Sequence, residues 1–129
     1  MALVLMAVLL VGCSVQSVHR TDVIGLWKHP ADTSQSVDIR QDGTFLIRNV
    51  SKGALSGKAP AASAPYTQIG TWQLERHRGS HRSYLLLLGV DGSDHSFIST
   101  FEIVGSGASL TIYLPLGGRY EGRRFEFTR

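Results

Sequence analysis

The chain has 129 residues, of which 43% are hydrophobic and 18% charged, and it carries a formal net charge of +3. This composition is too apolar for a disordered chain, and the length suits one domain with a single core. The only cysteine is Cys13, so a disulfide within the chain is excluded.

The first twelve residues carry no charge and are fewer than the roughly 20 that a membrane-spanning helix needs. They have the length of the apolar core of a signal peptide, and they end in Leu10-Val11-Gly12-Cys13. This ending resembles the lipobox of bacterial lipoprotein precursors. The resemblance implies cleavage before Cys13 and acyl chains on that cysteine, which anchor the protein without a transmembrane helix. The alternative is a soluble protein with an apolar first strand and a buried thiol.

The residue after the cysteine is Ser14, whereas aspartate at this position can retain such lipoproteins at the inner membrane. For a Gram-negative cell, the resemblance therefore implies an outer-membrane lipoprotein whose domain faces the periplasm. The expected organisation is a signal peptide over 1–12, a lipidated cysteine and tether over 13–21, and one domain over 22–129. An exported basic chain meets anionic lipids, polysaccharides and proteins, so we expect no nucleic-acid partner.

From Asp22 onward, apolar residues recur mainly at every second position, and glycine-containing turns interrupt them every eight to twelve residues. This pattern predicts an all-β antiparallel meander of about eight strands and no strong helix. The strands are expected at 22–28, 36–40, 44–50, 69–75, 83–90, 96–104, 109–114 and 123–129.

Three local features refine this prediction. Asp42-Gly43 between two strand-like runs predicts a tight hairpin, because glycine adopts positive φ at little cost. Residues 51–66, rich in Ala, Ser, Gly and Pro, predict a long loop. The four consecutive leucines at 85–88 predict a strand that is covered on both faces.

Eight antiparallel strands joined by short turns predict a closed up-and-down barrel, with a β-sandwich as the alternative. Gly25-x-Trp27 on the first strand, the Asp-Gly hairpin and a late aromatic strand ending in arginine resemble small lipocalin-like bacterial lipoproteins. The resemblance implies that Trp27 closes one end of the barrel under a cation from Arg123, Arg124 or Arg129. Together with Trp27 and Ile39, the residues expected to fill the interior or line a ligand pocket are Trp72, Leu74, Phe97, Phe101, Ile112, Phe125 and Phe127.

Basic side chains gather between the fourth and fifth predicted strands and form a candidate patch for anionic partners or lipid head groups: Arg76, His77, Arg78 and Arg82. A metal bound by His77 and His81, with His19, His29 or His95 as a third ligand, is disfavoured because no cysteine or carboxylate stands at ligand spacing. Asp91 and Asp94 predict a turn rather than a calcium site. We find no nucleophile elbow, carboxylate pair or phosphate-cradling loop, so neither an enzyme nor a cofactor is expected.

Two functions from different classes fit these features. The first is an envelope protein that binds a small apolar or amphipathic ligand inside its barrel, or serves as an accessory of the envelope. The second is a periplasmic inhibitor or immunity-type lipoprotein that contacts a protein partner through its surface. A carrier requires an apolar cavity with a mouth, whereas tight packing of the interior residues excludes a carrier.

Overall fold

The computed structural model describes residues 18–55, 65–76, 82–90, 96–105, 107–117 and 122–129. The predicted signal peptide and Cys13 lie outside this part of the chain. The described strands are β1 (Gly25–His29), β2 (Asp32–Ile39), β3 (Thr44–Ser51), β4 (Pro65–Arg76), β5 (Ser83–Val90), β6 (Ser96–Val104), β7 (Thr111–Pro115) and β8 (Arg124–Thr128). Three short helical segments accompany them: α1 (Arg20–Val23), α2 (Lys52–Leu55) and η1 (Gly107–Ser109).

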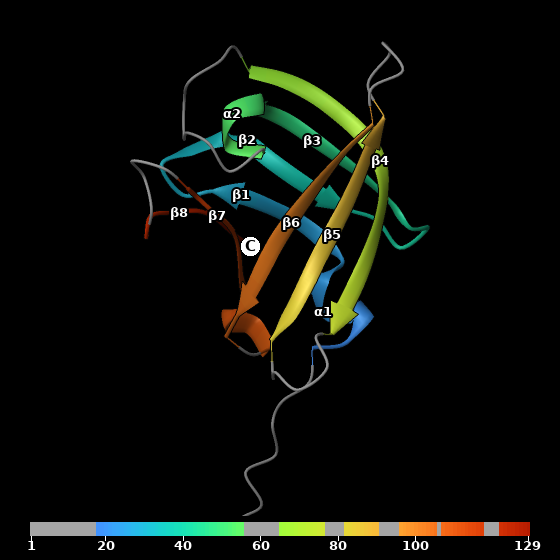
Figure 1. The fold of residues 1–129 in the computed structure, drawn as a ribbon. Helices are drawn as coiled ribbons and strands as arrows, with labels where there is room; N and C mark the ends of the chain where they lie inside the picture. The colour runs from blue at the N-terminus through green and yellow to red at the C-terminus, as the bar shows by residue number, and fades with distance from the viewer. Residues whose placement is uncertain (1–17, 56–64, 77–81, 91–95, 106, 118–121) are drawn as a thin grey trace, which may run out of the picture.

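The strands form a closed barrel in which each strand pairs antiparallel with the next along the chain (Figure 1). The last strand returns to the first, where Thr128 on β8 pairs with Lys28 on β1. The predicted lipocalin-like, up-and-down barrel of eight antiparallel strands is therefore confirmed, and the β-sandwich alternative is excluded.

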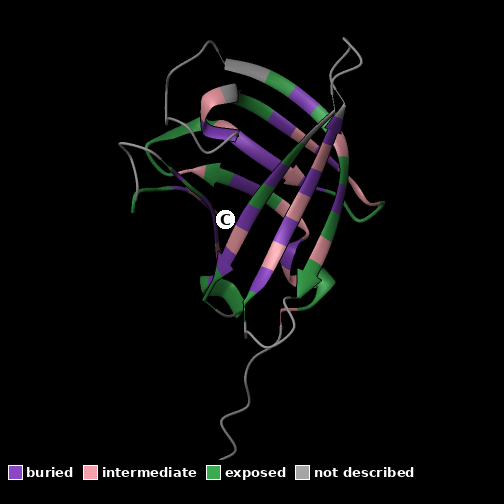
Figure 2. Ribbon diagram, in the orientation of Figure 1, coloured by how far each residue is buried: buried purple, intermediate pink, exposed green. Residues whose placement is uncertain are grey.

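Alternation along the strands places apolar side chains inside the barrel and polar ones outside (Figure 2). On β2, Val37 and Ile39 are buried while Asp38 between them is half-buried. On β8, Phe125 and Phe127 are buried and the side chain of Glu126 lies on the other face. These faces are the ones that the sequence predicts.

The hairpin at Asp42-Gly43 forms as predicted. Gly43 has φ +88°, its N–H donates to the carbonyl of Arg40 (3.1 Å), and the N–H of Arg40 donates to the carbonyl of Thr44 (3.0 Å). This is a three-residue loop with a glycine bulge after the turn. The Asp42 carboxylate accepts bonds from the hydroxyl (2.6 Å) and the N–H (2.9 Å) of Thr44, and these bonds lower the pKa of Asp42.

The structure differs from the prediction at the start of the domain. Of the tether predicted over 14–21, only residues from 18 onward are described, and there Val18 packs against the core and α1 begins at Arg20. The N–H of Asp22 donates to the carbonyl of His19, and the N–H of His19 donates to the Asp22 carboxylate. These local bonds form one helical turn that has too few residues to produce a visible period in the sequence.

Two further predictions were wrong. The segment 51–66 is not one loop, because β3 continues to Ser51, residues 52–55 form α2, and β4 begins at Pro65. Ala54 and Leu55 are buried in the core, so contacts with the barrel stabilise a turn that the sequence does not indicate. The leucines of β5 alternate instead of being covered on both faces: Leu85 and Leu87 are buried, whereas Leu86 and Leu88 are half-buried.

Candidate functional site

One end of the barrel is closed around Trp27. The indole N–H of Trp27 donates to the carbonyl of Val23 in α1 (2.9 Å), and the Arg129 guanidinium lies 4.6 Å from the centre of the indole ring. Arg129 also donates to the carbonyl of Gly107 in η1. Of the three arginines predicted as candidates for this role, Arg129 occupies it, while Arg124 instead lies over the ring of Tyr113.

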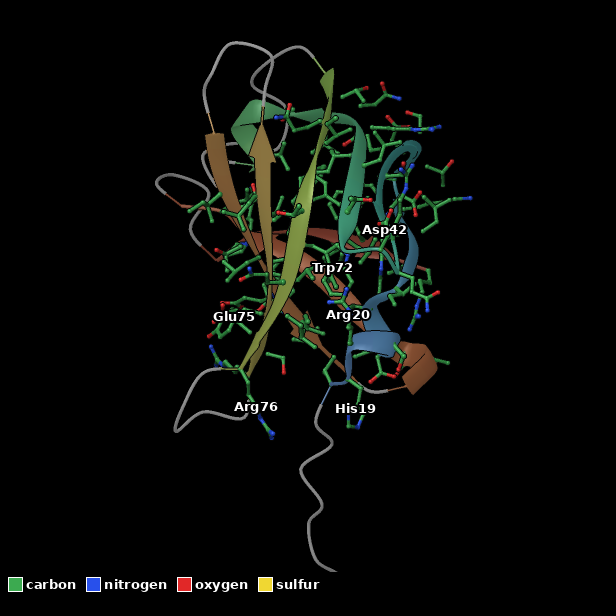
Figure 3. All side chains as sticks on the ribbon, turned by 90° about the vertical axis from the view of Figure 1, so that its right-hand side faces the viewer. His19, Arg20, Asp42, Trp72, Glu75 and Arg76 are labelled. Carbon is green, nitrogen blue, oxygen red and sulfur yellow. The ribbon has the colours of Figure 1, made fainter. Side chains whose placement is uncertain are left out.

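A second tryptophan at the same end repeats this arrangement. The indole N–H of Trp72 on β4 donates to the carbonyl of Arg40 (2.8 Å), and the Arg20 guanidinium lies 4.1 Å from the ring centre. Figure 3 shows Arg20 reaching from α1 toward Trp72. The sequence repeat Ile-Gly-x-Trp at 24–27 and 69–72 thus contains two tryptophans that each donate to a backbone carbonyl and lie under an arginine.

Removing either arginine cap should weaken the barrel without unfolding it. We expect Arg129→Gln and Arg20→Gln each to lower the free energy of unfolding by about 0.5–1 kcal/mol, because both guanidinium groups lie at the surface. Denaturant unfolding followed by tryptophan fluorescence measures this loss. Arg48→Gln, at another exposed arginine, is the control and should change stability less.

The opposite end is covered by α2 (Figure 1). The hydroxyl of Ser99 on β6 donates to the carbonyl of Leu55 (2.8 Å), and the N–H of Ala54 donates to the hydroxyl of Ser51 (3.1 Å). Hydrogen bonds therefore attach both ends of this short helix to the barrel wall, and its Leu55 side chain is only 4% exposed.

Among the described residues, a set of side chains in the middle of the barrel is closely packed. Side chains with an exposed fraction of zero have no water-sized void against them, and they come from seven of the strands: Trp27, Val37, Ile47, Leu85, Leu87, Phe101, Ile112 and Phe127. Trp72 contributes from the eighth strand, β4, and is 3% exposed.

The predicted interior set is largely brought together in this core. Phe127 packs edge-on against Phe101 and Phe125, with ring centres 5.9 Å and 5.4 Å away, and Ile112 is fully buried. Leu74 is half-buried and packs against the cluster. The side chain of Phe97 lies outside the described residues. Among the described residues, the buried amide nitrogen of Gln68 has no hydrogen-bond partner, a feature that sequence patterns do not indicate.

Tyr113 on β7 links two charged neighbours. Its hydroxyl donates to the Glu102 carboxylate, and Arg124 lies over its ring at 4.4 Å. Burial, and then the hydrogen bond to Glu102, raises the pKa of Tyr113 above its usual 10.

This raised pKa predicts a loss of stability in alkali. The folded protein holds the neutral phenol more strongly than the unfolded chain, so the contribution is complete below pH 10 and is lost as the pH rises from there through the raised value. Absorbance of the phenolate during an alkaline titration measures the pKa of Tyr113. The difference between the curves of the wild type and Tyr113→Phe should be one step with a midpoint above pH 10; a difference with its midpoint at or below pH 10 would refute the assignment.

The outer wall carries a groove of about 390 Å³ over β1, β2 and β3. Its lining includes Leu26, Lys28, Ser36, Asp38, Arg48 and Asn49. The sequence alone does not indicate this groove, because its residues come from three strands whose register the sequence does not specify.

The predicted basic patch is only partly described. Arg76 and Arg82 are exposed beside the paired ends of β4 and β5, where Arg76 pairs with Ser83, at the same end of the barrel as His19 (Figure 3). His77, Arg78, His81, Asp91 and Asp94 lie outside the described residues.

Within the described part of the chain, no three His, Cys, Asp or Glu side chains gather as metal ligands. In the same part, no helix is long and apolar enough to cross a bilayer.

The two tryptophans and their arginines belong to one closed end of the barrel. Comparison with family models, with curated proteins and with solved structures finds no match to this chain.

Proposed function

We propose that this protein is a lipid-anchored envelope accessory that recognises its partner through the outer surface of the barrel and carries no cargo inside it. The observation that supports a surface role is the close packing of the described interior, where side chains from seven strands are fully buried with no water-sized void beside them. A carrier needs an open pocket of a few hundred Å³ in this place. This assignment favours the surface-contact hypothesis over the ligand carrier.

The anchor would fix the orientation of the barrel. Val18 packs against the core, and Cys13 lies five residues before it. Five extended residues span at most about 17 Å, so acyl chains on Cys13 would hold the end of the barrel that contains α1 close to the bilayer. Exposed Arg76 and Arg82 at this end would then meet anionic lipid head groups.

Lipidation can be tested directly. We expect the full chain expressed in a Gram-negative host to sediment with membranes and to incorporate a palmitate analogue, and we expect Cys13→Ala to lose the label and to be retained with its signal peptide attached. The thioether cannot form without the sulfur, so the loss should be complete. Wild-type protein that incorporates no label would contradict the anchor.

The absence of cargo is tested on the lipidated protein extracted in mild detergent. Native mass spectrometry should give the mass of the protein and its acyl chains alone, and titration with cis-parinaric acid, a fluorescent fatty acid, should show no saturable binding. A discrete additional mass that is lost on denaturation, or saturable binding of the fatty acid, would contradict a surface role and restore the carrier.

A further inference from the structure

We propose that the groove over β1, β2 and β3 binds a phosphate monoester carried on a polar molecule. This inference rests on the proposed function, because it names the chemistry that the outer wall recognises. The groove has a volume of about 390 Å³, which is enough for a phosphate and an attached sugar-sized group.

The register of the strands places two cations, Lys28 and Arg48, on either side of this groove. Lys28 on β1 pairs with Ser36 on β2, and Ser36 pairs with Arg48 on β3. Directly paired residues point to the same face, so these three side chains form one row across the outer wall. Ser36 is short and only 7% exposed, whereas Lys28 and Arg48 are exposed on both sides of it. The strands β1 and β3 are roughly 10 Å apart, so one anion above Ser36 can reach both cations.

Charge in the groove favours an anion. Among the described residues, neither Lys28 nor Arg48 forms an ion pair, whereas Asp38 in the neighbouring row is paired with Arg40 at 3.2 Å. A phosphate monoester carries about −1.5 to −2 charges at neutral pH and accepts several hydrogen bonds. Two unpaired cations and the Ser36 hydroxyl match this group better than a singly charged carboxylate.

The rest of the groove is polar and locally ordered. Thr33, Ser34 and Asn49 line the part beyond Ser36. Asn49 adopts φ +58°, a left-handed conformation that asparagine tolerates, and its amide donates to the carbonyl of Ser34 (3.0 Å). Hydroxyl and amide groups beside an anion site fit the hydroxyls of a sugar or a glycerol.

Isothermal titration calorimetry of the full chain with glucose 6-phosphate tests the site, with glucose as the ligand that lacks the phosphate. We expect saturable binding of glucose 6-phosphate alone. Lys28→Gln and Arg48→Gln should each weaken it about tenfold, which corresponds to one charge-assisted hydrogen bond. Ser36→Leu should abolish it by filling the floor of the groove without a change of charge. Arg123→Gln removes the same charge from an exposed position outside the groove and should leave the affinity unchanged.

Vesicles distinguish a soluble phosphate monoester from a lipid one. Stronger binding to vesicles of phosphatidic acid in phosphatidylcholine than to phosphatidylcholine alone, lost in Lys28→Gln, would identify a lipid head group as the source. The proposal is overturned if neither glucose 6-phosphate nor phosphatidic acid binds, or if Arg123→Gln weakens binding as much as the groove variants do. Either result leaves the proposed function standing, because that function is contradicted by a missing lipid anchor or by cargo in the barrel interior, and neither depends on the groove.

Discussion

Gly70→Ala should lower the free energy of unfolding by about 3 kcal/mol or more, because the barrel wall has no room for the added methyl group. A Cβ atom at this position would lie 2.0 Å from the carbonyl oxygen of Leu88 and 2.8 Å from the ring of Phe45. Real Cβ contacts do not reach such distances, so β4 must move away from β5 or the ring must leave the core. Both movements disrupt the barrel wall, because Gly70 pairs with Phe45 on one side and with Gly89 on the other.

Gly107→Ala separates this crowding from backbone strain. Gly107 has φ +56° and nothing lies within 4 Å of its added Cβ, so only the left-handed conformation opposes the methyl group, at a cost of about 1 kcal/mol. Urea unfolding followed by tryptophan fluorescence compares the two variants. Equal losses of stability in both would show that the contact between Gly70 and Leu88 is relaxed by small adjustments.

Phe101→Ala should lower the free energy of unfolding by about 3–5 kcal/mol and should also create a binding site for small apolar molecules. The Phe101 side chain is fully buried and its ring contacts that of Phe127. Truncation therefore leaves a void that the closely packed neighbouring side chains cannot close. Engineered apolar cavities stay dry and bind molecules of the size of benzene. Thermal unfolding with and without benzene measures both effects, because a ligand of the folded state raises Tm.

Ile98→Ala on the same strand is the matched control. This side chain points outward and is 64% exposed, so its truncation should change the free energy of unfolding by no more than about 0.5 kcal/mol and should give no response to benzene. If benzene raised the Tm of the wild-type protein as much as that of Phe101→Ala, the interior would already contain a cavity, and the argument for a surface role would fail.

The sequence predicts most of the barrel because its signals are local. The bounds of β5 and β6 agree with the predicted segments 83–90 and 96–104, and the Asp-Gly pair locates the hairpin between β2 and β3. In each case alternation over eight or nine residues, or a turn that only glycine adopts easily, identifies the element without knowledge of its neighbours.

The elements that the sequence does not predict depend on contacts between distant residues. The helix α2 is one turn long and is attached through Ser99, which lies 44 residues from Leu55. The choice of Arg129 over the other C-terminal arginines depends on where β8 joins β1. The groove likewise requires Lys28, Ser36 and Arg48 to fall into one row, and a register shift of one residue would move them to different faces.

The seam between β8 and β1 also governs the order in which the barrel forms. Every other pairing joins strands that are consecutive in the chain, so each hairpin can form as soon as its two strands meet. The seam instead joins the two ends of the domain, and Lys28 with Thr128 is the one ladder pair that the described strands make there. Until β8 arrives, Trp27 lacks its arginine cap and the edge of β1 stays unpaired. Until the seam closes, the unpaired edge of β1 is therefore available for pairing with another chain, and closure of the seam removes that edge.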